Sequence, residues 1–334
     1  MFSSSGYYSY RHLSLLRFSM LSILGLSMTA CQSLTPIAET ITPANNQPKV
    51  ALVLGGGGAK GFAHIGVIKA LEANGIKPTL VVGTSVGSLV GSLYASGYTA
   101  KELERLALTT TDSELTDFTL SNQGFIEGIK LKNFINANVN GRTIESFPIS
   151  FAAVAAEKQS LKKAVFTTGD TGLAVQASCS VPNIFISPRI PEKVGKKYID
   201  GGVVSLVPVD SARALGANII IAVDVNAANT NTSTLNQKST ISSLTSFWGF
   251  LENSLMANAA YNAKASPINH NAASMRHERD RADIVIIPNV GQISSLDTSQ
   301  RQALITAGTQ ATTRQINAIK QLIKDQTKSK YATL

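Results

Sequence analysis

The chain is poor in the residues that build metal centres and disulfide-bonded scaffolds. Its 334 residues include four histidines and two cysteines, and these show neither an H-E-x-x-H motif nor a metal-ligand Cys/His spacing. Charged residues make up only 15% of the chain, and the basic ones form no run dense enough to indicate a nucleic-acid partner. After residue 31, no apolar run approaches the roughly 18 residues that a membrane-spanning helix needs. The sequence therefore predicts neither a metal site nor nucleic-acid binding, and its body is not predicted to span a membrane.

Apolar residues, in contrast, are plentiful and make up 44% of the chain. That is enough for a substantial core, and the length allows one large domain or two small ones. The formal net charge is +9 at pH 7, which suits a protein near anionic lipid headgroups but also follows from the need for solubility. The charge alone does not decide between the two.

The first thirty residues have the organisation of an export signal rather than of a folded domain. Arg11 and Arg17 give a basic start, no acidic residue occurs before Glu39, and an apolar run follows at residues 18–30. Small residues end that run directly before Cys31. This arrangement resembles the lipobox of bacterial lipoproteins, with a methionine where that motif usually has leucine.

The resemblance implies that residues 1–30 are a signal peptide and that Cys31 is acylated and becomes the new N-terminus. Residues 31–48 are polar and contain prolines, so they are predicted to form a flexible tether. A lipidated Cys31 leaves Cys179 without a partner, so no disulfide is expected. Gln32 after the cysteine implies anchoring in the outer membrane, facing the periplasm. The alternative is an ordinary secretory signal followed by a chance cysteine.

From residue 49 onward, short apolar runs alternate with stretches of helical periodicity. Helices are expected at residues 59–74, at 86–96 and around 247–265. Strands are expected at residues 50–54, 79–82, 149–155, 163–167, 197–199, 218–223 and 283–287. Strands that are continuous Val/Ile/Leu runs, with helices between them, are typical of a mainly parallel sheet covered on both faces. The sequence therefore predicts a three-layer α/β/α domain.

Two stretches do not follow this alternation. Residues 110–147 mix polar residues and glycine with partial periodicity, and we expect them to form a cap near the site. Residues 226–243 are rich in Asn, Thr and Ser, and we expect them to form a mobile loop.

A glycine-rich turn, GGGGAKG at residues 55–61, follows the first predicted strand. Glycines at a strand-to-helix junction expose successive backbone N–H groups, which can bind a phosphate or a developing oxyanion. The turn also satisfies the dinucleotide pattern G-x-G-x-x-G, but the second strand ends in Gly83-Thr84-Ser85 instead of the acidic residue that would hold a ribose. A Walker phosphate loop is excluded as well, because no Ser or Thr follows Lys60.

Residues 83–87 (GTSVG) form a G-x-S-x-G motif between a predicted strand and a predicted helix, which is the context of a nucleophile elbow. Gly83 and Gly87 permit the sharp turn that presents the Ser85 hydroxyl above the sheet. Small residues on one side of the following helix allow it to pack against the glycine-rich turn. In this context, Ser85 is predicted to be a catalytic nucleophile.

A nucleophilic serine needs a base, and the usual base is histidine. His64 lies among apolar residues of the first helix, where a packed structural role is expected, and His270 and His277 lie in a polar stretch with no strand end to fix them. The remaining candidate is Asp200, which ends a predicted strand and precedes two glycines. Asp224, at another strand end, is interpreted as a structural carboxylate.

Together these motifs resemble those of the patatin-like phospholipases. The similarity is carried by four stretches between residues 49 and 225 (ALVLGGGGAKGFAHIGVIKAL, VVGTSVGSLVGSLYASG, AVQASCSVPNIF and IDGGVVSLVPVDSARALGANIIIAVD), and a weaker one, ADIVIIPNV, extends it toward residue 320. Lys60 stands where the family more often has arginine, and Asn183 where it usually has glycine. The resemblance implies a patatin-like hydrolase domain at residues 49–325, followed by a tail at 326–334.

The resemblance also implies the roles of the site residues. Ser85 would be the nucleophile, Asp200 its general base in a Ser–Asp dyad, and the N–H groups of Gly57, Gly58 and Ala59 the oxyanion hole. The expected activity is hydrolysis of acyl esters through an acyl-enzyme, with phospholipids or lysophospholipids as substrates and no metal or organic cofactor. The membrane would be a partner through the lipid anchor.

Two other functions remain open at this stage. An α/β-hydrolase with a Ser–Asp–His triad would use His270 or His277, both of which follow Asp200 in the chain. A non-catalytic lipoprotein would bind lipid or a partner through the same glycine-rich turn. An essential histidine would favour the first, and lipid turnover that does not depend on Ser85 would favour the second.

Overall fold

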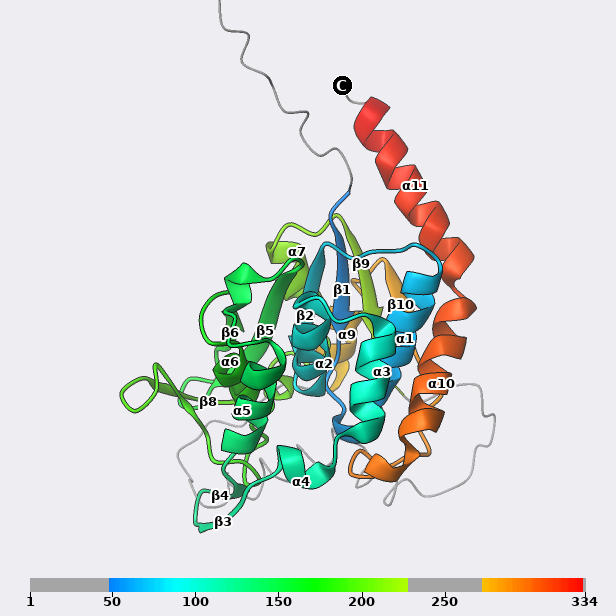
Figure 1. The fold of residues 1–334 in the computed structure, drawn as a ribbon. Helices are drawn as coiled ribbons and strands as arrows, with labels where there is room; N and C mark the ends of the chain where they lie inside the picture. The colour runs from blue at the N-terminus through cyan, green and yellow to red at the C-terminus, as the bar shows by residue number, and fades with distance from the viewer. Residues whose placement is uncertain (1–47, 228–271, 333–334) are drawn as a thin grey trace, which may run out of the picture. The chain divides into compact units, whose positions relative to one another are not determined.

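The computed structural model describes residues 48–227 and 272–332, which fold around one large β-sheet (Figure 1). Within these residues the sheet has eight strands in the order β10-β9-β1-β2-β5-β8-β7, with β6 paired to β5. Its strands are β1 (Val50–Leu54), β2 (Leu80–Thr84), β5 (Ser150–Glu157), β6 (Lys163–Phe166), β7 (Arg189–Ile190), β8 (Lys196–Asp200), β9 (Ile219–Val223) and β10 (Ile284–Ile286). A separate two-stranded hairpin consists of β3 (Phe118–Ser121) and β4 (Gly124–Ile126).

The central strands are parallel and buried along their whole length. β1 pairs in parallel with β2 and β9, β2 with β5, and β9 with β10. Every residue of β1, β2 and β9 is buried. Because such strands have no face turned toward water, their sequences are continuous apolar runs instead of alternating patterns. β6 and β8 run antiparallel to β5, a direction that the sequence pattern did not predict.

Helices cover both faces of the sheet. Val50, Leu52 and Leu54 of β1 face the larger helical layer, and Ala51 and Val53 face the opposite layer. The larger layer contains α1 (Phe62–Ala73), α2 (Val86–Ala95), α3 (Ala100–Thr109), α5 (Ile129–Asn138), α6 (Thr171–Ser178) and α10 (Arg301–Thr313). On the other side, α7 (Val209–Ala214) packs on the sheet next to α9 (Ala272–Arg279). α11 (Ile316–Ala332) follows α10 and adds Ile316 and Ile319 to the core of the larger layer.

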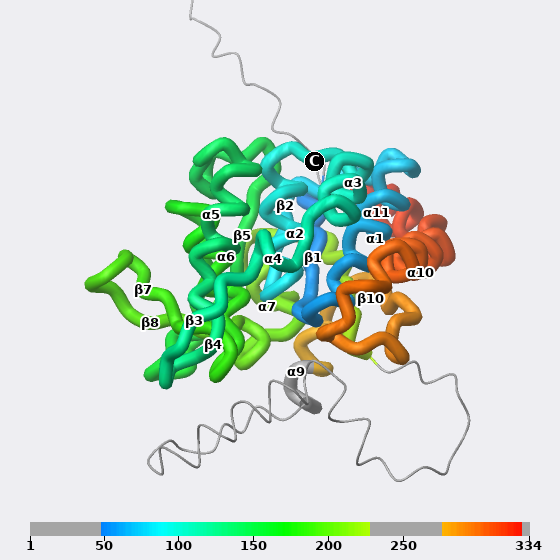
Figure 2. The backbone as a smooth tube through the Cα atoms, turned by 60° about the horizontal axis from the view of Figure 1, so that its bottom comes forward, coloured from blue at the N-terminus to red at the C-terminus, as the bar shows by residue number. Residues whose placement is uncertain are grey.

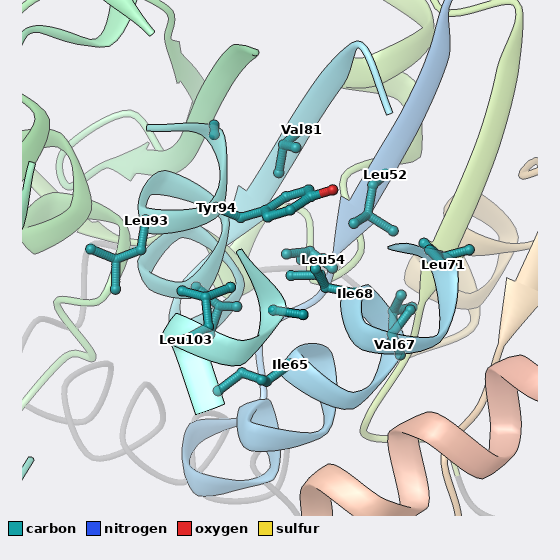
Figure 3. Close-up of a cluster of buried hydrophobic side chains, with 14 of the residues drawn as sticks. Leu52, Leu54, Ile65, Val67, Ile68, Leu71, Val81, Leu93, Tyr94 and Leu103 are labelled. Carbon is teal, nitrogen blue, oxygen red and sulfur yellow. The ribbon is translucent and has the colours of Figure 1, made fainter. Parts of the chain in front are cut away.

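The main core lies between the sheet and helices α1 to α3 (Figure 3). Leu52 and Val81 contribute from the strands, and Ile68 contributes from α1. The ring of Tyr94 reaches from α2 toward Leu52, and burial raises the pKa of its hydroxyl to about 12. The elbow helix α2 is thereby held on the sheet by side chains from three elements.

Two glycines bring α1 and α10 into backbone contact. A Cβ at Gly66 would lie 1.9 Å from the carbonyl oxygen of Ile305, and a Cβ at Gly308 would lie 1.9 Å from the carbonyl oxygen of Ala63. The Thr309 hydroxyl donates to the Gly66 carbonyl at 3.2 Å. This contact fixes α1, the helix that continues from the glycine-rich turn.

The carboxyl ends of β1, β2 and β9 lie at the lower edge of the sheet in Figure 1. The short helix α4 (Asp112–Leu115) and the β3–β4 hairpin lie at the same end of the molecule, which Figure 2 turns toward the viewer. Open parallel sheets bind ligands at the carboxyl ends of their strands. The predicted cap at residues 110–147 therefore contains α4, β3, β4 and α5.

The predicted three-layer α/β/α fold with a mainly parallel sheet is confirmed, and each predicted strand is present. The predicted helix at 247–265 lies outside the described residues, and so do the signal peptide, almost all of the tether and most of the loop at 226–243. α11 continues through the predicted boundary at residue 325 to Ala332. No helix in the described part of the chain has the length and apolarity needed to cross a membrane.

Replacing Gly66 by alanine should destabilise the protein, although alanine has the higher helix propensity. The added methyl group would force α1 and α10 apart, and overpacking of this kind costs about 1–3 kcal/mol or more. The free energy of unfolding in urea measures the effect. Gly291→Ala is the matched control, because a Cβ there meets nothing within 4 Å. Equal stability of the two variants would contradict the close helix contact.

Candidate active site

Ser85 lies at the turn between β2 and α2, in a backbone conformation that few residues adopt. Its φ is 54° and its ψ is −130°, and strain of this kind clusters at functional sites. Two glycines make room for the turn. A Cβ at Gly83 would lie 2.4 Å from the carbonyl oxygen of Gly87, and a Cβ at Gly87 would lie 2.1 Å from that of Leu54. The chain thus has the strand, strained serine and helix of a nucleophile elbow.

Hydrogen bonds from three elements hold the backbone of Ser85. Its N–H donates to the Ser178 hydroxyl at 2.9 Å, and that hydroxyl donates to the Val154 carbonyl at 2.6 Å. The Ser88 hydroxyl donates to the Ser85 carbonyl at 2.7 Å. The peptide groups around Ser85 are therefore fixed by α6, β5 and α2.

The register of the sheet brings Asp200 level with Ser85. Thr84, the last residue of β2, pairs with Val154 of β5, and the next residue of β5, Ala155, pairs with Asp200 at the end of β8. Ser85 follows Thr84 directly, so one strand separates the backbones of the two predicted dyad residues. The antiparallel direction of β8 is what places its carboxyl end at this point.

Asp200 is fully buried, and no salt bridge reaches it from the described residues. Burial raises the pKa of Asp200 to about 7, although the Ser85 hydroxyl and the Gly202 N–H both lower it. Oδ1 accepts the Gly202 N–H at 2.7 Å, whereas Oδ2 has no partner of normal hydrogen-bond geometry among the described residues. The Ser85 hydroxyl therefore lies close enough to lower the pKa of Asp200, but no hydrogen bond of normal geometry joins it to Oδ2.

Cys179 is a second nucleophilic group near the dyad, but its thiol is kept neutral. It is buried, and its Sγ lies 3.9 Å from the Ser88 hydroxyl oxygen. Burial, and then the charge of Asp200, raise the pKa of the Cys179 thiol above its usual range. Because a thiol reacts as the thiolate, Cys179 does not compete with Ser85 as a nucleophile.

The backbone of the glycine-rich turn is held on several sides. The Gly55 N–H donates to the carbonyl of Val223 at the end of β9 at 3.1 Å, and the Gly56 N–H donates to the carbonyl of Leu206 at 3.0 Å. The Gly55 carbonyl bonds to His64 Nε2 at 2.8 Å, and the Gly56 carbonyl accepts from the Asn226 side chain at 2.6 Å. The N–H groups of Gly57 and Gly58 have no acceptor among the described residues. These two donors are the ones left to bind an anion.

The third predicted donor, the N–H of Ala59, is engaged elsewhere. It donates to the carbonyl of Ser295 at 2.8 Å. The same carbonyl would lie 2.3 Å from a Cβ at Gly58, whose φ is 57°. The loop at Ser295 therefore packs against the turn and removes Ala59 from the set of free donors, so we leave Ala59 out of the proposed oxyanion hole.

A cavity of about 200 Å³ opens beside the elbow and the glycine-rich turn. Gly58 and Val86 line it on that side, and its other walls are mainly apolar side chains of α1, α2 and α3, with Leu103 among them. Leu103 is shown with Ile65 and Leu93, two other lining residues, in Figure 3. The cavity has the apolar lining needed to hold a hydrocarbon chain whose polar end lies at Ser85.

An ion pair forms part of the rim of this cavity. Arg301 binds Asp112 at 2.6 Å, and the Asp112 side chain is 57% exposed. The Thr298 hydroxyl donates to the same carboxylate at 2.6 Å, and the Arg301 guanidinium lies 5.1 Å from the ring centroid of Phe62. These contacts tie α4 to the start of α10, so the two elements enclose the cavity together.

Comparison with known proteins agrees with this geometry. Residues 52–213 match the family model described as patatin-like phospholipase. These residues form a patatin-like phospholipase domain. An uncharacterized NTE family protein of Mycobacterium tuberculosis is 33% identical over 190 residues, which cover 55% of this chain and 51% of that protein. Human patatin-like phospholipase domain-containing protein 6 is 33% identical over 184 residues, which cover 53% of this chain and 13% of that protein.

The match thus spans about half of the mycobacterial relative and a much smaller part of the human one. Among solved structures, VipD from Legionella pneumophila has a similar fold, with a TM-score of 0.55 and 15% sequence identity. The alignment covers 81% of this chain and 67% of VipD. At that identity the likeness concerns the fold alone.

Neither of the two histidines among the described residues, His64 and His277, is bonded to Ser85 or Asp200. His64 is fully buried, and burial lowers its pKa to about 4, so its neutral ring donates to the Gly55 carbonyl. The expected structural role of His64 is thereby confirmed. His277 lies exposed on α9, and His270 lies outside the described residues. Asp224 binds Arg279 at 3.0 Å and accepts two backbone N–H groups, which confirms it as a structural carboxylate.

Several positioning groups of the patatin-like domain escaped the sequence analysis. Ser178, which holds the Ser85 N–H, lies in the stretch AVQASCSVPNIF but was given no role there, and Ser295, which holds Ala59, belongs to no motif. Lys60 is 3% exposed, and burial lowers its pKa while the nearby Asp224 opposes that shift. Among the described residues, no three His, Cys, Asp or Glu side chains are grouped in a way that could hold a metal ion.

The raised pKa of Asp200 predicts how the reactivity of Ser85 depends on pH. Below about pH 7 the carboxyl is protonated and cannot accept the proton of the serine hydroxyl, so the rate of Ser85 modification by a fluorophosphonate should rise with pH, with a midpoint near 7. Labelling rates between pH 5 and 9 measure this. Asp200→Asn should react slowly at every pH. A wild-type rate that is the same at pH 5 and pH 8 would contradict the assignment.

Proposed function

We propose that this protein is a serine lipid-acyl hydrolase that works with a Ser85–Asp200 dyad. The observation that carries the proposal is a strained serine beside a fully buried carboxyl with a pKa of about 7, with no histidine of the described residues bonded to either. At neutral pH such a carboxyl can accept the serine proton and give it back. The patatin-like phospholipase domain supports the same class of chemistry.

The proposed reaction has two halves. Ser85 Oγ attacks the ester carbonyl carbon while its proton passes to Asp200, and the N–H groups of Gly57 and Gly58 bind the oxygen that becomes negative. Collapse of this intermediate breaks the ester bond, and the proton on Asp200 goes to the leaving alcohol. A water molecule then attacks the acyl-Ser85 ester with Asp200 again as the base, which releases the fatty acid. The scheme needs no metal or organic cofactor.

The substrates we propose are glycerophospholipids or lysophospholipids. The mainly apolar cavity beside Val86 offers space for an acyl chain whose carbonyl lies at Ser85. Each CH₂ group that an acyl chain buries contributes about 0.8 kcal/mol, so this cavity can supply much of the binding energy. The names of the relatives, several of which are patatin-like phospholipase domain-containing proteins, support a lipid ester over a small soluble ester.

We also propose that a lipidated Cys31 anchors the enzyme in the outer membrane, facing the periplasm. The basis is the sequence at the end of the apolar run, residues 18–30. The two acyl chains of the thioether-linked diacylglycerol give stable anchoring, whereas one chain gives only marginal binding. The tether at residues 31–48 would let the folded body reach membrane lipids at high local concentration.

Ser85→Ala should abolish hydrolysis of phospholipid and lysophospholipid esters and leave the protein folded. Removing the nucleophile of a serine hydrolase costs on the order of 10⁶-fold in kcat. Ser92→Ala is the matched control, because Ser92 is a buried serine of α2, the helix that follows Ser85, and within the described residues its hydroxyl donates to the Leu89 carbonyl and not to the site. Turnover that survives in a folded, pure Ser85→Ala protein would refute the proposed nucleophile, whereas a pure wild type without turnover would favour a binding lipoprotein.

Ala107→Phe should shift the chain-length preference of the enzyme. Ala107 lines the cavity, so a phenyl ring there occupies space that the acyl chain would use. We expect kcat/KM for long-chain esters to fall by about tenfold or more, the effect of losing two buried CH₂ groups, with little change for butyryl esters. Leu108→Phe is the control, because Leu108 is 46% exposed on the same helix. Equal losses for short and long chains would argue that the acyl chain binds elsewhere.

Mass spectrometry of the mature N-terminus tests the anchor. The expected N-terminal residue is Cys31 with a thioether-linked diacylglycerol, and Cys31→Ser should remain uncleaved by the lipoprotein pathway and carry no acyl label. An unmodified N-terminus, or cleavage at any other bond, would overturn this part of the proposal. The result does not bear on the Ser85–Asp200 dyad, which is assayed on the purified protein.

A further inference from the structure

The β3–β4 hairpin displays its apolar side chains to solvent and turns its polar ones toward the protein. On β3, Phe118 is 81% exposed and Leu120 is 100% exposed, whereas Thr119 and Ser121 are half-buried. On β4, Phe125 is 62% exposed. A strand with one solvated face normally carries polar residues on that face. The hairpin therefore has apolar residues on its outer face, where an ordinary surface strand has polar ones.

This exposure does not come from a poorly attached loop. The N–H groups of Phe125 and Ile126 both donate to the Ile184 carbonyl at 2.8 Å, and the Ile126 carbonyl accepts from Ile186 at 2.8 Å. A Cβ at Gly124 would lie 2.8 Å from the backbone of Phe185, so β4 is seated closely on this neighbouring segment. The hairpin presents its apolar face from a fixed base.

The base of the hairpin is also fixed to α5. The Asp117 carboxylate, directly before β3, accepts the N–H groups of Gly128, Ile129 and Lys130 at 2.7–3.0 Å. These are N–H groups at the start of α5, which have no partner within the helix. The orientation of the hairpin relative to α5 is thus set by charge-assisted hydrogen bonds.

The β7–β8 segment, which contacts the hairpin, is basic. Residues 188–198 contain four Lys or Arg residues and one Glu residue, although three acidic residues precede the hairpin at 112–117. Of the four cations, Lys196 is paired with Glu157. Lys197 of β8 donates to the Gln123 side chain in the hairpin turn at 2.8 Å, so the two segments are in contact. Val194, at the turn between β7 and β8, is 84% exposed. Apolar tips beside such a basic segment are complementary to the anionic surface of a bilayer.

The hairpin lies at the same end of the molecule as the carboxyl ends of β1 and β2, where Ser85 begins the elbow (Figures 1 and 2). It spans only residues 118–126, whereas a stable protein interface takes roughly 20–30 residues from each partner. The small apolar tip, the basic β7–β8 segment and this position together favour a lipid surface over a protein partner.

We propose that the β3–β4 hairpin inserts Phe118, Leu120 and Phe125 into the interface of an anionic bilayer and so turns the Ser85 end of the sheet toward the membrane. Insertion requires no catalytic residue and is independent of the Cys31 anchor. The role of this insertion in bringing membrane lipids to Ser85 rests on the proposed function.

A depth-sensitive probe tests the insertion. The full chain in the Ser85→Ala form, which leaves the lipids intact, is labelled at Leu120→Cys with an environment-sensitive fluorophore and mixed with vesicles of phosphatidylcholine and phosphatidylglycerol. Cys179 is buried and should not label, and the protein without an added cysteine gives the background, which includes any label on Cys31. Lys324→Cys is the control, because Lys324 is exposed on α11, a helix that lies away from the carboxyl ends of the strands in Figure 1.

We expect the fluorescence of the probe at residue 120 to shift to the blue and to be quenched by lipids that carry a quencher in the acyl chain, while the probe at residue 324 does not change. Pure phosphatidylcholine vesicles should give a severalfold smaller response. A probe at residue 120 that stays in water when the protein is bound to vesicles overturns the proposal. An equal response with pure phosphatidylcholine and with the anionic vesicles also overturns it, because the cations would then have no role.

Activity assays link the insertion to the proposed function. Leu120→Ser in the active enzyme should lower hydrolysis of vesicle lipids about tenfold while leaving hydrolysis of a soluble short-chain ester unchanged. Val165→Ser, at an exposed apolar residue of β6, is the control. If Leu120→Ser lowers both activities equally, the hairpin is not an interfacial element. If the wild type hydrolyses neither ester, the proposed function fails, and the probe experiment still decides on insertion.

Discussion

The cost of burying the negative charge of Asp200 governs the chemistry that this site can perform. The carboxyl is fully buried, no salt bridge in the described part of the chain reaches it, and one backbone N–H gives it a well-formed hydrogen bond. Desolvation therefore holds its pKa at about 7 instead of the ordinary 3.8. An aspartate of ordinary pKa would be too weak a base to assist a serine at neutral pH. Burial gives Asp200 the basicity that histidine supplies in the more familiar serine hydrolases.

Bringing Ser85 next to Asp200 requires close packing of the backbone around both residues. Ser85 is held in a strained conformation, and Gly83, Gly87 and Gly201 each stand where a Cβ would lie 2.1–2.4 Å from a backbone carbonyl oxygen. The ends of β2, β5 and β8 are thus packed without side chains between them, and the register of these strands sets Ser85 opposite Asp200. Among the described residues, the N–H groups of Gly57 and Gly58 have no acceptor, whereas those of Gly55, Gly56 and Ala59 are already bonded.

Much of this could be predicted from the sequence, because buried parallel strands and an elbow leave local patterns. Strand β1 was predicted with its observed bounds, and Ser85 and Asp200 stand out as residues at strand ends next to glycines. Asn183 was noted as a departure from glycine. Its φ is 66°, which asparagine tolerates better than most residues, so the substitution keeps the turn.

The remaining features depend on residues that meet only in the folded chain. Whether Ala59 is a free donor depends on the carbonyl of Ser295, more than two hundred residues away in sequence. The reversed direction of β8 depends on its pairing with β5, and the exposure of Phe118 on how the hairpin is seated on the segment at 184–186. None of these contacts has a local sequence pattern, which is why the sequence predicts Ala59 as a third oxyanion donor although its N–H is already bonded to Ser295.

The central claim is that Asp200 alone serves Ser85 as its base. The most direct test measures kcat for a lysophospholipid with the wild type, Asp200→Asn, His270→Ala and His277→Ala. We predict that Asp200→Asn loses about 10²–10⁴-fold or more, the usual contribution of general-base assistance, and that both histidine variants retain wild-type kcat. A histidine variant as inactive as Asp200→Asn would contradict the dyad and establish a Ser–Asp–His triad instead.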